Sequence, residues 1–395
     1  MNKKVIALAV AGALASPLAA QAQTANVTMY GTFRLAFESV DLKDVGRANK
    51  IDSWSSRWGI RGIESLGGGL NAIFQLETGV NLDTPGNATF ESTAPGTNAS
   101  NRYQFITIRE AWAGLNGGFG TIKMGAGLTA WDDVFGMDHL LLSNGIENMN
   151  NLAGGVNPVI SGGNNFAAYG SLVGGAASTA NPALIGQACN NSTAFDARYG
   201  SHVRYDSPNF SGLTFATSFA FLGENATGFK CKGWDSALIY RNGPIEAGLG
   251  YARHIDFQFY DGNAWRLHAG YNFGVAKILG AYERIHLDGN NGTSGEATTR
   301  YYVVGVQVPL GPGVLSGQYG NRNKGATAAG TAVTEVQNGG GKQYSVSYKY
   351  GFSKRTYVYT WAAQIKADSD AQVLDSRAPK GGKVTAVGFG IQHNF

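Results

Sequence analysis

The sequence has few charges, few prolines and no long apolar run beyond its first residues, and each shortage excludes a class of protein. Charged residues make up 15% of the 395 residues, against roughly 25% in an ordinary soluble domain, whereas hydrophobic residues reach 43%. Disorder requires low hydrophobicity and high net charge, so this chain folds. Only 10 prolines and no Gly-X-Y period exclude collagen. A bundle of membrane-spanning helices needs apolar runs of roughly 18 residues, which the sequence lacks.

Glycine and aromatic residues are abundant instead. The chain has 57 glycines, about twice the usual share, and 11% of its residues are aromatic. With so few charges, this composition is typical of a large β protein.

Residues 1–22 have the organisation of a secretory signal peptide. Two lysines give a basic start, Val5–Ala15 is apolar but too short to span a bilayer, and Ala20-Gln21-Ala22 fits the cleavage pattern. The short run disfavours the alternative, an N-terminal anchor helix. Cleavage leaves 23–395 as one domain and removes two lysines and no acid, so the net charge falls from +4 to 4 − 2 = +2. So small a charge gives no reason to expect a nucleic-acid partner.

Apolar and polar residues alternate along many segments, as on a strand with one oily and one polar face. In the first segment Val27, Met29 and Phe33 share one face, whereas Thr32 and Arg34 share the other. Turn signals divide the chain into sixteen such segments. They are 26–40, 53–65, 68–82, 103–116, 118–126, 199–208, 211–223, 232–242, 244–255, 263–273, 275–287, 299–309, 312–322, 341–350, 355–366 and 382–395.

The connections between these segments alternate between short turns and long loops. The long ones are 41–52, 83–102, 127–198, 224–231, 256–262, 288–298, 323–340 and 367–381. A barrel with an even number of antiparallel strands has one tight rim and one elaborate rim in this way. The sequence therefore predicts an all-β fold, a 16-stranded antiparallel transmembrane β-barrel.

The polar face argues against the alternative, a soluble sandwich with a dry core. The polar residues that point to one side of their strands are Arg34, Glu38, Arg57, Arg61, Gln75, Glu77, Lys123 and Arg204. A dry core cannot hold so many charges, whereas a water-filled lumen can. Closure also removes the strand edges that a bilayer cannot solvate. Aromatic residues near strand ends, among them Tyr30, Trp58, Tyr271 and Trp361, are interpreted as interfacial girdles.

Several motifs occur together along the mature chain. Ser56–Gly62 reads SRWGIRG, Leu66–Glu77 reads LGGGLNAIFQLE, Val203–Gly212 reads VRYDSPNFSG, and the chain ends in His393-Asn394-Phe395. Jointly they resemble the general diffusion porins of β-proteobacterial outer membranes, the neisserial-type porin family. The resemblance covers essentially the whole mature chain.

This resemblance implies a protein of the cell outer membrane that is exported through the periplasm and forms a homotrimer. It also implies a long third extracellular loop folded into the lumen, and an assembly signal in Phe395 that the barrel-assembly machinery recognises. Outer-membrane lipid and lipopolysaccharide are expected as partners, and small ions and solutes as cargo. No cofactor is expected.

The resemblance places a basic pore constriction at Arg57, Arg109 and Arg198. Further basic residues that could extend this wall are Arg34, Arg61, Lys123 and Arg204. Arg109 alternates in step with Ala111 and Leu115, which look lipid-facing, so it needs a bulge to reach the lumen. The alternative for each arginine is a solvated or interfacial side chain.

The inserted loop is expected within 127–198. Its acids are Asp132, Asp133, Asp138 and Glu147. Acids that face a basic wall create a transverse field, and rings of basic residues favour anions. We therefore predict a water-filled, weakly anion-selective channel for passive diffusion of ions and small hydrophilic solutes. Because the loop is unusually long, the alternative is a substrate-specific channel that the loop gates or narrows.

The remaining signals are weaker. Cys189 and Cys231 both fall in expected extracellular loops and can form a disulfide in an exported protein, the alternative being two free thiols. The six histidines show no metal-ligand spacing, so no metal site is predicted. No Ser/His or Asp/His set typical of a barrel enzyme is visible, and no enzymatic activity is expected. An adhesin that uses the long loops is compatible with a pore.

Overall fold

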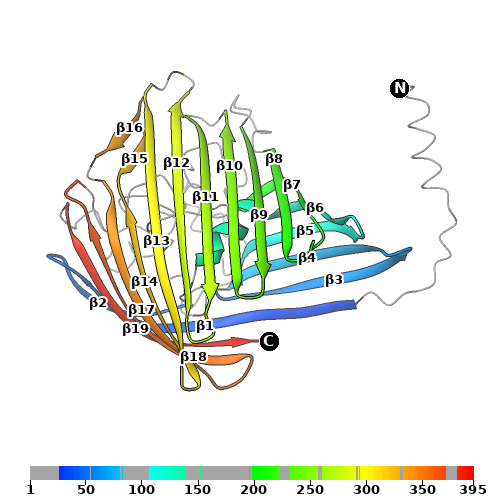
Figure 1. Cartoon of the computed structure of the whole chain (residues 1–395), viewed down its shortest axis with the longest axis horizontal. Helices are drawn as coiled ribbons and strands as arrows, with labels where there is room; N and C mark the ends of the chain where they lie inside the picture. The colour runs from blue at the N-terminus through cyan, green and yellow to red at the C-terminus, as the bar shows by residue number, and fades with distance from the viewer. Residues whose placement is uncertain are drawn as a thin grey trace, which may run out of the picture.

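In the computed structural model, tilted antiparallel strands form one large sheet that closes on itself (Figure 1). The structure describes residues 26–53, 55–80, 82, 106–138, 140, 149, 152, 195, 198–221, 231–256, 260–290, 292, 294–329, 332–337, 339–370 and 380–395. The predicted signal peptide lies outside these residues, so its cleavage stays a prediction.

The strands of the closed sheet follow the chain order. They are β1 (Asn26–Leu42), β2 (Gly46–Asp52), β3 (Arg57–Gly67), β4 (Leu70–Val80), β5 (Ile106–Gly117), β6 (Gly120–Leu128), β7 (Arg198–Asp206), β8 (Leu213–Phe221), β9 (Lys232–Asn242), β10 (Ile245–Ile255), β11 (Tyr260–Asn272), β12 (Lys277–Gly289), β13 (Glu296–Leu310), β14 (Gly313–Arg322), β17 (Gly341–Gly351), β18 (Thr356–Ala367) and β19 (Lys383–Asn394). A separate hairpin consists of β15 (Gly325–Ala329) and β16 (Ala332–Val336). Helix α2 (Ala130–Phe135) and the 3-10 helix η1 (Gly136–Asp138) follow β6. Among the described residues, no helix is long and apolar enough to cross a membrane.

Strands β2 and β3 share one position in the barrel. Leu42 pairs with Gly46 on β2 and Thr32 pairs with Arg57 on β3, so both strands run along the same edge of β1. The seventeen strands of the sheet therefore fill sixteen positions, and the β1–β19 pairing closes the barrel. The predicted 16-stranded antiparallel barrel is confirmed.

Two of the predicted loops are wrong in part. More than half of the loop expected at 41–52 is strand β2, which pairs with the end of β1 from Ala36 to Leu42. The loop expected at 323–340 contains the β15–β16 hairpin. The sequences GRANKID of β2, GATAA of β15 and AVTEV of β16 do not alternate apolar and polar residues, so this pattern predicts none of these strands.

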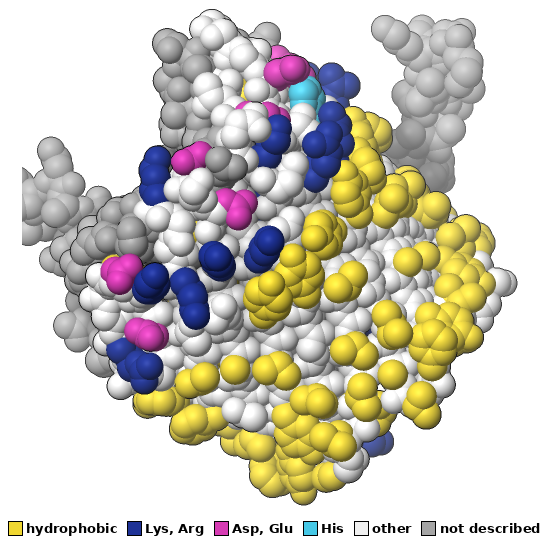
Figure 2. All heavy atoms as spheres, turned by 60° about the vertical axis from the view of Figure 1, so that its left-hand side comes forward, with side chains coloured by type: hydrophobic (Ala, Val, Ile, Leu, Met, Phe, Trp, Pro, Cys, Tyr) yellow, Lys and Arg dark blue, Asp and Glu magenta, His cyan; other side chains and the backbone are white. Residues whose placement is uncertain are grey.

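The two faces of the barrel differ as the alternation predicts. On β1, Val27, Met29 and Phe33 are exposed, whereas Arg34 and Glu38 are buried inside. Hydrophobic side chains cover a broad zone of the outer surface in Figure 2. The girdle prediction is wrong for two aromatic residues. The Tyr30 hydroxyl donates to Glu77 on the inner face at 3.2 Å, and Trp361 is only 3% exposed.

The barrel closes at the last residue of the chain. The backbone N–H of Phe395 donates to the Gly31 carbonyl at 3.1 Å, and the N–H of Gly31 donates back at the same distance. The Phe395 ring packs edge-on against Phe33, with centroids 5.0 Å apart. A Cβ on Gly31 would lie 2.3 Å from that ring, so only glycine admits it. The terminal aromatic ring therefore seals the seam between β1 and β19.

Candidate pore constriction

Helix α2 opens the third extracellular connection and lies against the inner wall of the barrel. The Asp132 carboxylate accepts hydrogen bonds from the Thr129 N–H at 3.1 Å and the Thr129 hydroxyl at 2.9 Å, as in a capping box. The backbone N–H groups of Ala130 and Trp131 donate to Asp235 on β9, at 2.6 and 3.2 Å. Asp235 is 2% exposed, so a buried wall carboxylate fixes the start of the helix.

Inward-facing glycines make room for this connection. A Cβ on Gly248 would lie 2.7 Å from the Met137 sulfur, and one on Gly250 would lie 3.2 Å from the Trp131 ring. Similar close approaches join Phe195 to Gly262, Leu140 to Gly305 and Met149 to Gly320. The described part of the third connection therefore lies inside the barrel, as predicted.

A buried ion pair lies beneath α2. The Arg266 guanidinium on β11 is 2.5 Å from the Glu283 carboxylate on β12, and both side chains are almost fully buried. The rings of Phe135 and Tyr301 lie 4.8 and 5.5 Å from the guanidinium carbon. Phe135 thereby packs onto a wall charge that a glutamate already neutralises, so this pair supports the helix and does not face the passage.

Three arginines and two glutamates meet on β3, β4, β5 and β7. The Glu77 carboxylate lies 3.4 Å from the Arg57 Nε and accepts a hydrogen bond from the Arg109 Nε at 2.9 Å. The Arg198 Nε is 3.7 Å from the Glu110 carboxylate. The arginine side chains remain between 21% and 31% exposed, so they border open space in the lumen.

Arg109 reaches this cluster through a β-bulge. Glu77 pairs with Glu110, but the next residue, Thr78, pairs with Ile108, so Arg109 has no partner across the β4–β5 ladder. A bulge changes which face the following side chains occupy. Ile108 is therefore 53% exposed on the outside, while Glu110 is 9% exposed within the barrel. The bulge that the sequence required for Arg109 is present.

Arg34 completes what we call the constriction cluster: Arg34, Arg57, Arg109, Arg198, Glu77 and Glu110. The Arg34 Nε donates to the Gln392 side chain at 2.7 Å, and its charge acts on Arg57. Four arginines against two glutamates leave this cluster with 4 − 2 = +2 charges. The predicted trio Arg57, Arg109 and Arg198 is thus brought together in space.

The other predicted wall residues lie apart from the constriction cluster. Arg204 binds Asp133 on α2 and Asp206, and its guanidinium donates to the Thr129 carbonyl at 2.8 Å. Lys123 lies 3.2 Å from Asp206. Arg61 is exposed and stacks over the Tyr30 ring at 5.2 Å. The charge of Arg204 is therefore neutralised where it holds the third connection.

Known proteins that are similar to this chain agree with the barrel architecture described above. The family described as Gram-negative porin matches residues 7–370. The chain belongs to this family. The porin is 29% identical to outer membrane porin protein 32 of Delftia acidovorans, with full coverage of both chains. It is 28% identical to the major outer membrane protein P.IB of Neisseria meningitidis serogroup B over 65% of this chain and 61% of that protein.

A solved structure supports the fold of the porin. The anion-selective porin from Comamonas acidovorans superposes with a TM-score of 0.69 at 23% identity, over 94% of this chain and all of that one. The resemblance to neisserial-type porins is confirmed by these relatives. The porin is an outer-membrane channel for passive diffusion of ions and small hydrophilic solutes, as predicted.

Only two of the acidic residues expected in the third connection of the porin have side chains that the structure describes. Asp132 caps α2 and Asp133 is bound to Arg204, so both carry structural contacts. The Asp138 side chain and the whole of Glu147 lie outside the described residues. Cys189 also lies outside them, and its proposed partner Cys231 is buried at the start of β9. The disulfide stays a prediction.

Sequence reasoning missed three parts of this site. It placed Glu77 on the polar face of its strand but assigned it no role, and it did not single out Glu110. Each of these glutamates forms an ion pair with an arginine of the constriction cluster. It also missed Asp235, which lies 105 residues from the helix N–H that it binds. The alternation of β9 places Asp235 on the inner face, and this inward-facing carboxylate is the sequence signal that could have identified it.

We expect the ion preference of the porin to depend on pH through Asp132. Burial raises the pKa of its carboxyl to about 7, although Arg198 and the Thr129 bonds act in the opposite direction, and Asp235 also faces it. From pH 8 to pH 6 the folded protein takes up a proton there, and the positive potential near Arg198 grows. Because this pKa lies above the unfolded value, the protonation stabilises the fold at low pH and the gain is lost as pH rises through about 7.

We therefore expect the anion-to-cation permeability ratio to rise about twofold on acidification in 0.1 M salt, the effect of one screened charge about 8 Å from the ion. Reversal potentials measured from pH 8 to pH 6 test this. Asp132→Asn should have the high ratio throughout. If the Asp132→Asn variant keeps the full pH dependence, that dependence arises from another titratable group.

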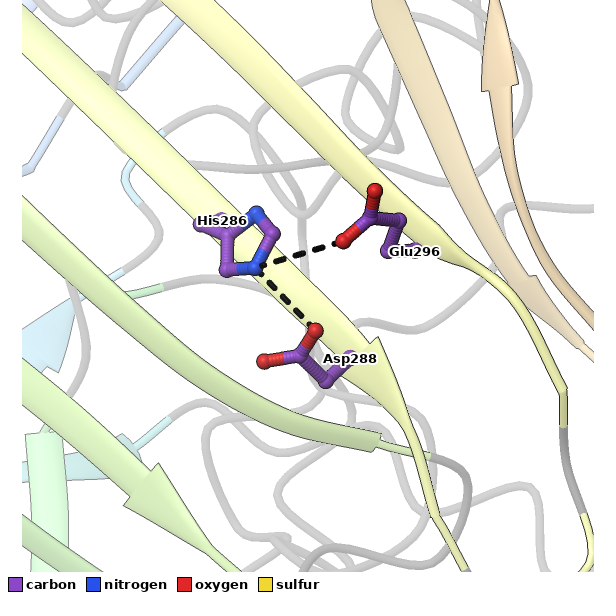
Figure 3. Close-up of side chains that lie close together, drawn as sticks. All are labelled: His286, Asp288 and Glu296. Carbon is purple, nitrogen blue, oxygen red and sulfur yellow. Dashed lines mark hydrogen bonds and ion pairs between the residues drawn. The ribbon is translucent and has the colours of Figure 1, made fainter.

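A histidine and two carboxylates meet outside the pore. His286 Nε2 lies 3.1 Å from Asp288 and 4.0 Å from Glu296, and Nδ1 lies 2.8 Å from the Thr298 hydroxyl (Figure 3). These side chains alternate with the buried Ile285, so they face outward at the long-loop end of β12 and β13. Cross-strand pairing brings them together, which spacing along the chain does not reveal. They take no part in the constriction.

Proposed function

We propose that the porin is a weakly anion-selective general diffusion channel whose preference is set by Arg57, Arg109 and Arg198. The observation that carries this proposal is the excess of two positive charges in the constriction cluster beside open lumen space. The acids of α2 do not cancel this excess fully, because Asp133 is already bound to Arg204. The anion-selective character of the Comamonas acidovorans porin, which has the same fold, agrees with the proposal.

Reversal potentials of single channels in a salt gradient test this proposal. We expect anions to be preferred at 0.1 M salt, and the preference to fade toward 1 M, because the Debye length falls from about 10 to about 3 Å. A clear cation preference would contradict it. A current that saturates and is inhibited by one solute would instead favour a substrate-specific channel.

Several further properties are proposed on the resemblance. They are assembly as a homotrimer, membrane insertion through the C-terminal strand with Phe395 as its signal, and contact with lipopolysaccharide. The β1–β19 seam supports the second, since the strand that carries the signal is also the one that closes the barrel. A Cys189–Cys231 disulfide would tie the third connection to the start of β9. We assign the porin no enzymatic activity.

A further inference from the structure

Three lysines form a row on the outside of the barrel at the long-loop ends of β17, β18 and β19. Lys342 pairs directly with Lys366, and Lys366 pairs directly with Lys383. All three side chains are exposed, and they alternate with buried neighbours such as Gln343 and Ile365 that face inward. The lysine row, defined as Lys342, Lys366 and Lys383, therefore faces away from the pore.

The lysine row lies directly above the apolar belt. One layer below it are Tyr344, Gln364 and Thr385, which pair across the same strands. The next layer consists of Val346, Ala362 and Val387 in the same register, and both valines are about half exposed. Figure 2, which brings this side of the barrel forward, shows Lys and Arg side chains, with Asp and Glu side chains among them, above the hydrophobic zone. The row is thus at the height of lipid headgroups.

Like charges that face each other across an antiparallel pair repel and destabilise the sheet. The lysine row contains two such pairs in succession, and among the described residues no ion pair includes any of its members. Asp368 is the carboxylate whose charge acts on Lys342 and Lys366. The nearby Asp41 is bound to Arg47, and the exposed Lys43 adds a further positive charge beside Lys383. Among the described residues around it, the row therefore has a surplus of positive charge.

We propose that the lysine row binds the phosphate groups of a polyphosphorylated lipid in the outer leaflet. A single phosphate would leave part of the row uncompensated, whereas a headgroup with two or more phosphates matches its width across three strands. Tyr344 and the valines below provide the surface on which the acyl chains of the same lipid pack. The inference deepens the proposed contact with lipopolysaccharide and rests on it, because it assigns that lipid a site.

The test compares the triple variant Lys342→Gln, Lys366→Gln, Lys383→Gln with the intact porin. Native mass spectrometry in detergent counts the bound lipopolysaccharide, in its phosphorylated form and after removal of its phosphates. Each lysine near an anionic headgroup contributes roughly a fivefold change in binding, so we expect the triple variant to lose at least tenfold for the phosphorylated lipid. Binding of the dephosphorylated lipid should be weak and equal in both proteins.

The matched control removes three charges at the opposite rim, in the variant Arg241→Gln, Lys354→Gln, Arg355→Gln, whose side chains are exposed at short turns. It should bind like the intact porin, and replacing the lysine row by arginine should preserve binding. If the intact porin binds no lipopolysaccharide, the proposed contact with this lipid is itself wrong. Undiminished binding by the lysine variant would overturn only the site. A change of oligomeric state with unchanged lipid binding would also overturn it, because the row would then belong to a subunit contact.

Discussion

Replacement of Arg57, Arg109 and Arg198 by glutamine is expected to change the porin from an anion-preferring to a cation-preferring channel. The constriction cluster holds four arginines and two glutamates, so its charge falls from +2 to 1 − 2 = −1. Glu77 and Glu110 then become the dominant charges beside the passage. The reversal potential of single channels in a salt gradient measures the change of sign.

The expected size follows from screened electrostatics. A unit charge about 8 Å from a passing ion in water changes the energy of that ion by about 0.5 kcal/mol. At 0.1 M salt the Debye length is about 10 Å, which roughly halves this energy. Since each charge acts with opposite sign on anions and cations, three charges change the permeability ratio by about tenfold.

Two further variants separate the position of the charges from their number. The variant that removes Arg241, Lys354 and Arg355 at the short turns loses the same charge and should keep the anion preference. Replacing the three constriction arginines by lysine should also keep it. If the glutamine variant at the constriction kept the anion preference, the constriction cluster would not control selectivity.

The sequence predicts the barrel well because lipid and water demand opposite faces at every strand. The segment expected at 232–242 is strand β9 with the same bounds, and that expected at 382–395 is β19 to within one residue at each end. The demand ends where the strands leave the membrane. Strand β2, with the sequence GRANKID, lacks this alternation and gave no strand signal.

The candidate site could be predicted only in part. Arg109 shows why, because its alternation with Ala111 points it toward lipid, and a one-residue bulge opposite Glu77 and Thr78 reverses that. A bulge depends on the register between two strands, which a single strand does not contain. The chemical rule that an arginine avoids lipid was therefore more informative than the alternation.

The anchoring of the third connection was hidden for a different reason. Asp133 was expected to face a basic wall across the passage. It does contact Arg204, but the two side chains form a direct ion pair. Asp235 and Gly250 support α2 from strands about a hundred residues away. Such contacts depend on where the loop lies inside the barrel, and the spacing of residues along the sequence does not predict that position.

Replacement of Asp235 by alanine is expected to release α2 from the wall and to enlarge the passage. The backbone N–H groups of Ala130 and Trp131 lose their charged acceptor, and a bond of this kind contributes about 1.5 to 3 kcal/mol. A loss of about 2 kcal/mol shifts the balance between anchored and released helix by about 30-fold. Single-channel conductance and its noise should both rise, and liposome swelling should admit larger sugars.

The neighbouring strand positions supply the controls for this release. Ser236→Ala changes the next residue of β9, whose hydroxyl bonds Thr217 on the outside at 2.9 Å, and should leave conductance unchanged. Asp235→Asn keeps an acceptor oxygen and should give an intermediate conductance. Trp131→Ala removes the ring that packs on Gly250 and should act in the same direction as Asp235→Ala. A folded Asp235→Ala barrel with the original conductance and size limit would show that the hydrophobic contacts of α2 hold it without the carboxylate, since those are the contacts that remain.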